Sequence, residues 1–372
     1  MGTKKRRNGE GSVSYDEDRG TYRVWVTSPN GKRVSKRFSS EEEALTWKNQ
    51  QLHSMDQGIF VQPSKITLGQ WVLEWLSQKK QSVSLGTYEN YVYISGHLDL
   101  IAQYKLQEIQ PLQIYQLYRH LSKSLSGCTI HKVHKLLKAS LGKAVSLNLT
   151  PKNIMLDIDT PKFEKKDIAI FSREDIEKIL QTCHDHCVLK KKYPMILLAA
   201  TTGIRLGELL GLRWCDVLFP TNEIFIRKSL KASKTEGIYL GSLKTKSSIR
   251  KIRITEDMMK IFRSLRADVK NMDINQETFC FPARTGNPIS LRNMERAWDD
   301  IIRNAKVPYK NIHVLRHTHA TELLAAGVPI IEVSRRLGHS KVSHTLELYG
   351  HAIPNYDDKI AEKVTQLYVV PQ

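Results

Sequence analysis

The sequence predicts a multidomain α+β protein made of a small three-stranded sheet plus helix, a helical bundle domain and a mainly α mixed domain. Three observations predict this class. Alternating β-forming residues open the chain, apolar residues at helical spacing fill its middle, and helical patterns interrupted by short strand-like runs fill the rest. The length of 372 residues is enough for two or three domains, at least one of them with a substantial core.

We place three domains at residues 1–62, 63–160 and 168–372. Pro63 leads out of the first domain. Pro161 and the charged run that follows it are typical of a linker between the second and third domains.

The first domain is predicted to be a sheet. Residues 21–27 and 32–38 alternate in polarity and are rich in β-forming types. Asn30 and Gly31 between them are the signal of a two-residue type I′ hairpin. Residues 11–15 can add a further strand.

A helix follows the sheet, opened by the capping-box pair Ser40 and Glu43. Five basic residues crowd the two hairpin strands, and a β-ribbon of this kind can enter the DNA major groove. A solvated basic face is the alternative. We favour DNA contact, because so small a unit does not need this many charges for solubility. The residues are Arg23, Lys32, Arg33, Lys36 and Arg37.

The second domain is predicted to be helical, with Pro111 at the start of one helix. Lysines in its last helix either contact phosphates or form ordinary surface: Lys132, Lys135, Lys138 and Lys143. Apolar residues at helical spacing are expected to form its core: Trp71, Val72, Trp75 and Leu76, then Ile114, Leu117, Tyr118 and Leu121.

The charge balance points to a polyanionic partner. Lys and Arg total 57 against 38 Asp and Glu, which gives a formal net charge of +19. Nucleic acid is the commonest such partner, although a merely basic protein has the same composition. The five cysteines form no disulfide-like framework and no zinc-finger spacing. We therefore expect a reducing cytoplasm and no metal.

The third domain carries residues suited to phosphoryl transfer, and Ser172 with Asp175 predicts its first helix cap. Gly203 permits a tight turn before Arg205, and Glu208 lies three positions further on, which puts both side chains on one helix face. Arginine suits a phosphate because its planar fork meets two oxygens at once and keeps its charge.

Further candidates follow towards the C-terminus. His313 and Arg316 are spaced to share a helix face, His339 follows a Leu-Gly pair, and Tyr349 comes ten positions later. A phosphodiester can be broken without hydrolysis by a nucleophile, cations that stabilise the charged transition state, and an acid for the leaving oxygen. This series offers the nucleophile and the cations.

The order and spacing of these groups closely resemble the tyrosine recombinase (phage integrase) family. The resemblance covers roughly the C-terminal half. The two preceding segments look like arm-site-binding and core-site-binding domains, as in integrases of phages and of conjugative transposons of Gram-positive bacteria. Four motifs in order are far more specific than any one. They are Gly203-Ile204-Arg205 with Glu208-Leu209, residues 313–318, Leu337-Gly338-His339-Ser340, and Tyr349-Gly350-His351.

The resemblance implies a catalytic third domain with a role for each group. Arg205 and Arg316 would grip the scissile phosphate, and His339 would donate to one of its non-bridging oxygens. Glu208 would orient Arg205 without touching DNA. Tyr349 would attack to give a 3′-phosphotyrosine and a free 5′ hydroxyl.

Two proton-transfer roles follow from the resemblance. His313 would act as general base for the Tyr349 hydroxyl or hydrogen-bond the phosphate. A lysine on a β-hairpin would be the general acid, and residues 243–250 look like that hairpin. Lys244 fits the motif best, with Lys246 as competitor. The bond energy stays in the covalent intermediate, so no cofactor is expected.

The implied function is a site-specific integrase that joins and excises a mobile element or prophage. Its implied partners are double-stranded DNA attachment sites, three further copies in a homotetramer on DNA, an excisionase and a DNA-bending host protein. We expect no membrane association and a bacterial, nucleoid-associated location. Residues 361–370 either dock on a neighbouring copy or form an ordinary intramolecular helix or strand.

Three other functions compete. Residues 331–340 resemble part of a helix-turn-helix, which suggests a transcription factor but leaves the arginines and Tyr349 unexplained. A DNA-binding protein that never cuts conflicts with the intact catalytic set. A type IB topoisomerase is disfavoured by a separate arm domain. The remaining polar residues nearby are expected to cap, pack or hydrogen-bond locally: His317, Thr318, His319, His344 and His351.

Overall fold

The computed structural model describes residues 11–29, 31–58, 60–163, 168–243, 245–268 and 277–353. The chain divides into two compact units, residues 1–165 and 166–372. Several predictions fall outside the described residues: those on Asn30, Lys244, the side chain of His351, residues 164–167 of the linker, and residues 361–370.

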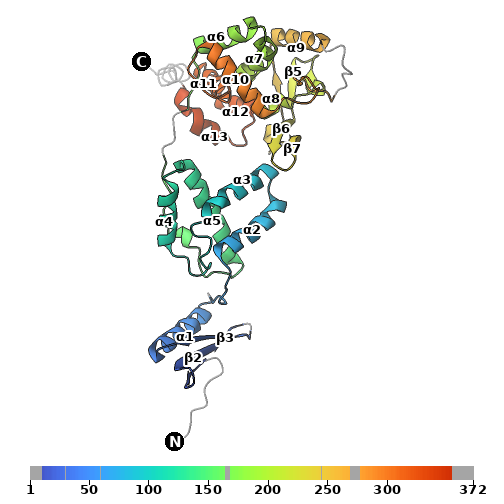
Figure 1. Cartoon of the computed structure of the whole chain (residues 1–372). Helices are drawn as coiled ribbons and strands as arrows, with labels where there is room; N and C mark the ends of the chain where they lie inside the picture. The colour runs from blue at the N-terminus through green and yellow to red at the C-terminus, as the bar shows by residue number, and fades with distance from the viewer. Residues whose placement is uncertain are drawn as a thin grey trace, which may run out of the picture. The chain divides into compact units, whose positions relative to one another are not determined.

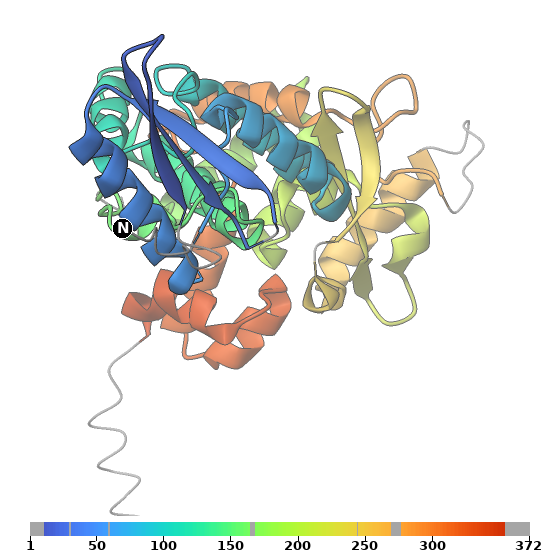
Figure 2. The same cartoon turned by 90° about the horizontal axis from the view of Figure 1, so that it is seen from below.

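The first unit begins with a three-stranded antiparallel sheet in the order β1 (Ser12–Asp16), β2 (Thr21–Thr27), β3 (Arg33–Phe38). Helix α1 (Glu41–Asp56) packs against one face of this sheet (Figure 1, Figure 2). Buried residues of the sheet and of α1 fill the space between them, which confirms the predicted sheet and helix. They include Val24, Val26 and Ala44.

The register of the sheet separates its basic residues by face. Arg23 lies opposite Arg37, whereas Lys36 lies opposite the buried Val24. Cross-strand partners share a face and successive residues alternate. Arg23, Arg33 and Arg37 therefore lie on the open face, while Lys36 lies on the face that α1 covers, with its ammonium 5.1 Å from the centre of the Phe38 ring. The predicted basic residues do not form one surface.

The hairpin turn differs from the prediction. Ser28 donates its N–H to the carbonyl of Lys32 (2.8 Å), and Gly31 donates to the carbonyl of Ser28 (2.9 Å). These bonds enclose three residues between the paired positions, so the two-residue type I′ turn is wrong. A two-residue turn would put Pro29 opposite Lys32, and proline has no N–H with which to close the pair.

Of the two predicted helix caps, one forms. The hydroxyl of Ser172 accepts from the N–H of Asp175 at 3.1 Å, and the Asp175 carboxylate accepts from the Ser172 N–H in return. Ser40 is the N-cap residue of α1, but its side chain makes no cap hydrogen bond, so the predicted capping box is wrong. Three glutamates in the first turn of α1 (41–43) place negative charge at the positive end of the helix dipole.

The rest of the first unit is a helical bundle, as predicted, with Pro111 at the start of a helix. Its core contains Trp71 and Trp75, and the indole N–H of Trp71 donates to the carbonyl of Ser140 at 3.0 Å. Its elements are α2 (Leu68–Ser82), α3 (Leu85–Ser95), α4 (Pro111–Leu121) and α5 (Gly127–Ser146), with 3₁₀ turns η1 (Gly96–Leu98) and η2 (Ile154–Leu156).

The second unit is mainly helical. Its described helices are α6 (Arg173–Asp185), α7 (Tyr193–Thr202), α8 (Leu206–Leu210), α9 (Glu256–Asp268), α10 (Leu291–Ala305), α11 (Val314–Ala325), α12 (Ile330–Leu337) and α13 (Val342–Tyr349). The 3₁₀ turns are η3 (Leu189–Lys192), η4 (Trp214–Asp216), η5 (Lys246–Ser248) and η6 (Gly350–Ala352).

Two small antiparallel sheets accompany these helices. One has the order β4 (Val217–Leu218), β5 (Glu223–Ile226), β8 (Arg250–Arg253), and the other pairs β6 (Lys228–Ser233) with β7 (Gly237–Ser242). The predicted strand-like runs are therefore confirmed. Residues 243–250 are not a hairpin, because β7 pairs with β6 while β8 pairs with β5, so this segment passes from one sheet to the other.

Candidate active site

Arg205 is placed by a tight turn between two helices. α7 ends at Thr202, and its C-cap residue, Gly203, has a left-handed backbone with φ of 63°. A Cβ atom here would come within 2.8 Å of the side chains of His319 and Leu337, so glycine is required. Arg205 follows as the N-cap residue of α8. Arg205 meets Glu208 as N-cap and third helical residue, and the two side chains are in contact, as their spacing predicted.

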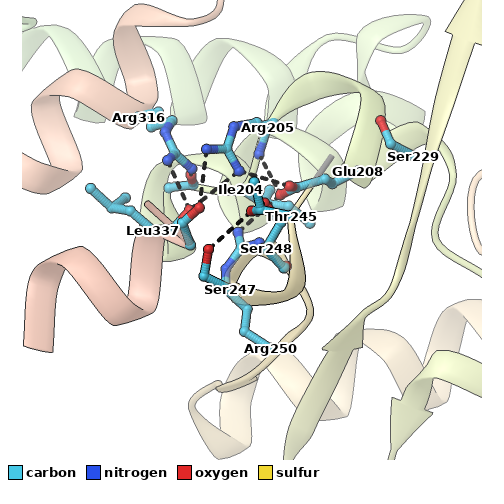
Figure 3. Close-up of polar contacts among 12 residues, drawn as sticks. Ile204, Arg205, Glu208, Ser229, Thr245, Ser247, Ser248, Arg250, Arg316 and Leu337 are labelled. Atoms are coloured by element: carbon cyan, nitrogen blue, oxygen red, sulfur yellow. Dashed lines mark hydrogen bonds and ion pairs between the residues drawn. The ribbon is translucent and has the colours of Figure 1, made fainter. Parts of the chain in front are cut away.

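The carboxylate of Glu208 is buried and holds two arginines. Its Oε1 accepts from Nη1 of Arg205 (3.0 Å), and its Oε2 accepts from Nη2 of Arg250 (2.9 Å) and from the backbone N–H of Arg205 (3.2 Å). Burial alone would raise the pKa of Glu208, but Arg250 and Arg205 outweigh it and lower that pKa. Glu208 is thus ionised and fixes the Arg205 guanidinium (Figure 3).

Arg316 lies beside Arg205, at the start of α11. Its Nη1 donates to the carbonyl of Gly203 (2.7 Å) and its Nη2 to the carbonyl of Leu337 (2.8 Å). Arg205 reaches the carbonyls of Leu337 (3.4 Å) and Gly338 (3.3 Å), so the two guanidinium groups meet at the end of α12 (Figure 3). Burial and the charge of Arg205 lower the pKa of Arg316 to about 9, which leaves it cationic at neutral pH. Two adjacent cations form a site for an anion.

His339 follows α12 directly, after Gly338 in the left-handed region (φ 69°). Its Nδ1 lies 2.8 Å from the hydroxyl of the buried Thr345. Burial, followed by the charges of Arg316 and Arg205, lowers the pKa of His339 to about 3, so the ring is neutral. With the Thr345 hydroxyl as donor to Nδ1, the ring proton is on Nε2, which can then donate to an anion.

Tyr349 ends α13 and is completely buried, with 0% of its surface exposed. Its hydroxyl lies 2.6 Å from Nδ1 of His317, not beside His313, the residue predicted to handle its proton. His313 is the exposed N-cap residue of α11, and its ring meets the ring of His317 edge-on with 4.9 Å between centroids. Burial raises the pKa of Tyr349, while Arg316 and Arg205 oppose that rise.

His317 is a functional candidate that the sequence did not single out. It was expected to cap or pack, and a signal did exist: it lies four positions after His313 on the same helix, hence on the same side. The expectations for two neighbours are confirmed. Thr318 accepts from the N–H of Phe171 (2.9 Å), and His319 accepts from Nε of Arg336 (3.2 Å).

The segment that carries the general-acid candidates has one described lysine. Lys246 is exposed in η5, and Lys244 lies outside the described residues. The hydroxyl of Thr245 lies 2.9 Å from that of Ser248, which closes the turn locally (Figure 3).

Arg250 is a second residue that the sequence did not single out. Besides Glu208, its buried guanidinium reaches the carbonyl of Ser248 through Nη1 (3.1 Å) and that of Arg336 through Nε (2.7 Å). A Cβ at Gly338 would come within 3.0 Å of it. Arg250 therefore joins the segment after Lys244 to Glu208 and to α12.

Among the described residues, no group of three or more His, Cys, Asp or Glu side chains is placed to hold a metal ion. No helix in the described part of the chain is long and apolar enough to cross a bilayer.

The model of the phage integrase family matches residues 170–355, and that of the N-terminal SAM-like domain of phage integrases matches residues 67–122. The chain belongs to the phage integrase family. It is a site-specific tyrosine recombinase, an enzyme that cuts and rejoins DNA strands through a phosphotyrosine.

Relatives of this recombinase extend over most of its length. It is 29% identical to a tyrosine recombinase XerC-like protein of Caldanaerobacter subterraneus, over 94% of this chain and 96% of the relative. It is 25% identical to the ICEBs1 integrase of Bacillus subtilis, over 75% and 77%.

Among solved structures, the Tn1549 transposon integrase in complex with a circular intermediate DNA matches with a TM-score of 0.72 at 21% identity, over 82% of this chain and 100% of that one. A lambda integrase dimer bound to a core site matches with a TM-score of 0.59 at 15% identity, over 93% and 96%. These likenesses confirm the multidomain α+β fold.

Proposed function

We propose that this recombinase integrates and excises a mobile genetic element, and that Tyr349 is its nucleophile. The observation that carries the proposal is the meeting of Arg205 and Arg316 at the carbonyl of Leu337, in the unit that also holds Tyr349. Each guanidinium has five N–H donors, so both retain donors for a phosphate after their protein contacts are made. The fixed carbonyl and Glu208 contacts preorganise these cations before DNA arrives.

The remaining groups complete the chemistry. Nε2 of His339 donates to a non-bridging oxygen as negative charge develops, and Glu208 keeps Arg205 in place. Lys244 protonates the leaving 5′ oxygen. Tyr349 then carries the 3′ phosphate until a 5′ hydroxyl from another strand displaces it. Because the phosphoester energy is kept in that bond, the cycle proceeds with neither cofactor nor metal.

Burial of Tyr349 places a requirement on this cycle. A side chain with no exposed surface cannot reach a phosphate, so the groups that cover Tyr349 must shift when DNA binds. A nucleophile that is withheld until DNA is bound protects the enzyme from futile cleavage. The small core around Tyr349, formed by Ala320, Leu324, Val333 and Leu337, is the packing that this shift must rearrange.

We propose that the first unit binds DNA through two separate parts. Arg23, Arg33 and Arg37 on the open face of the sheet are suited to a distant arm site, with Lys32 in the turn and Lys36 on the opposite face making smaller contributions. The helical bundle is proposed to contact the core site. A domain boundary near residue 62 would then separate two DNA-binding functions, and one near residue 160 would separate both from the catalytic domain.

The assembly is proposed to be a homotetramer on attachment-site DNA, assisted by an excisionase and a DNA-bending host protein, in the bacterial cytoplasm at the nucleoid. Support for the tetramer comes from the lambda integrase, whose structure was solved as a tetramer bound to a Holliday junction. Residues 361–370 are proposed to dock on a neighbouring copy.

Plasmid recombination tests the proposal. Two plasmids that carry the DNA flanking the gene of this recombinase, one with each end of the element, should recombine in its presence and not with Tyr349→Phe. Relaxation of any supercoiled plasmid without recombination would instead indicate a type IB topoisomerase. DNA binding with neither product would contradict the proposal.

A further inference from the structure

The contact between Tyr349 and His317 involves the phenol oxygen of Tyr349, which is the atom proposed to attack the phosphate. The phenol oxygen and Nδ1 are 2.6 Å apart, a strong hydrogen bond by distance, and the ring centroids are 5.6 Å apart. His317 lies next to Arg316 on α11, so one helix supplies both a cation for the phosphate and a partner for the nucleophile. Both residues lie in the second unit.

We propose that His317 holds the Tyr349 hydroxyl by this hydrogen bond and accepts its proton as the phenol oxygen attacks the phosphate. The inference rests on the proposed function of Tyr349. As the Oη–P bond forms, the O–H bond breaks and the proton moves to Nδ1. The P–O5′ bond then breaks, and the 5′ oxygen takes a proton from Lys244. In rejoining, each proton returns and the phenol is released.

The geometry favours His317 over His313. A general base must lie within hydrogen-bond reach of the proton that it removes. His317 satisfies this condition, whereas His313 reaches the pair through its ring contact with His317. His313 is exposed at the start of α11, which leaves it free to hydrogen-bond the phosphate, the other role that the sequence left open for it.

The His317 ring is uncharged in the free protein, as a proton acceptor must be. The groups that face it are His313 and Arg316 from α11 and Arg205 from the turn before α8. Burial, His313 and Arg316 lower the pKa of His317 to about 4, so at neutral pH its ring is neutral and Nδ1 has a lone pair to offer. A bound phosphate adds negative charge and raises that pKa, which makes His317 a better acceptor when DNA is present.

A single substitution separates holding the hydroxyl from accepting its proton. In His317→Asn, the amide oxygen can take the place of Nδ1 and accept the phenol hydrogen bond, but it cannot take up the proton. His317→Ala removes both functions. His184→Asn, on the exposed surface of α6, is the matched control. Thermal unfolding of all three variants shows whether each one folds.

The measurement is single-turnover formation of the covalent adduct on a prebound nicked suicide substrate, from pH 6 to 9, with the Kd for DNA measured separately. For His317→Asn we expect an unchanged Kd and a cleavage rate at pH 7 lowered by about 10²–10⁴-fold, the usual contribution of a general base. Its rate should rise about tenfold per pH unit, because the phenol must then lose its proton to solvent. The wild-type profile should be much flatter.

Two results would overturn the inference: a normal rate in His317→Asn, or a rate lowered by the same factor at every pH, which indicates a purely structural role. If His317→Asn fails to fold, the pH profile of His317→Ala decides by the same criterion. Failure of the wild-type protein to form an adduct would instead overturn the proposed function, so the two failures are distinguishable.

Discussion

Arg250 and Glu208 form an ion pair at 2.9 Å in which both side chains are buried. The same carboxylate binds Arg205, so a residue of strand β8 is connected through one acidic group to a proposed phosphate ligand. Arg250 also holds the carbonyl of Ser248, close to Lys244 in the chain. Arg250 therefore supports both the proposed phosphate site and the turn at Ser248, and it is itself not expected to touch DNA.

Replacement of Arg250 tests this support. Arg250→Met keeps much of the side-chain length but removes one cation from Glu208 and the Arg250 donors from the carbonyls of Ser248 and Arg336. We expect the free energy of unfolding to fall by about 3–5 kcal/mol, the usual cost of removing one partner from a buried ion pair. Urea denaturation measures it. Arg253→Met, at an exposed position of the same strand, should change it by about 0.5 kcal/mol at most. Equal effects of the two substitutions would refute the supporting role.

The general acid can be identified by changing the leaving group. Lys244→Met should slow cleavage of ordinary DNA by about 10²–10⁴-fold. The same variant should cleave a substrate in which sulfur replaces the bridging 5′ oxygen at close to the wild-type rate, because a thiolate leaves without being protonated. Lys246→Met is the matched control and should be normal on both substrates. The reverse pattern would assign the role to Lys246.

Stability should depend on pH through four histidines of the second unit. Their pKa values are all lowered, chiefly by burial, to about 4 for His317 and His319 and about 3 for His339, with His313 shifted in the same direction. Below about pH 6.5 these histidines are protonated in the unfolded chain but remain neutral in the folded chain, so stability is lost as the pH falls towards 4. Urea midpoints at pH 7.5 and 5 measure this. A midpoint that is unchanged or higher at pH 5 would contradict it.

The open face of the sheet makes a prediction for arm-site binding. Arg23→Ala and Arg33→Ala should each weaken binding and reduce the slope of log K against log salt by about 1, because each loses one phosphate contact. Lys36→Ala, on the face that α1 covers, should have a smaller effect. Anisotropy titrations at several salt concentrations provide the slopes. A larger loss with Lys36→Ala would place the DNA on the other face.

The sequence predicted the elements that depend on local pattern. Alternation gave the strands of the first unit, and helical spacing placed Trp71 and Trp75 in a core. Local chemistry also explains why the predicted turn is wrong. A two-residue turn at Asn30-Gly31 would be closed by Pro29 and Lys32, but Pro29 has no N–H to donate. The hairpin is closed by Ser28 and Lys32 instead.

The missed residues depend on distant partners. Arg250 forms hydrogen bonds with Glu208 and with the carbonyl of Arg336, which lie 42 and 86 positions away in the chain. The local sequence around Arg250 therefore gave no indication that its side chain is buried. His317 meets Tyr349 across 32 positions, and its role follows from the packing of α13 against α11. Motif spacing identified the residues that resemble the family, but it could not say which histidine the phenol contacts.

We propose above that Tyr349 forms a covalent bond to DNA. Its most direct test is to trap the recombinase on a nicked suicide substrate, digest the SDS-stable adduct, and map the modified residue by mass spectrometry. We predict a 3′-phosphonucleotide on the peptide that contains Tyr349, and no adduct with Tyr349→Phe. An adduct that maps to another residue, or that persists in Tyr349→Phe, would contradict the claim.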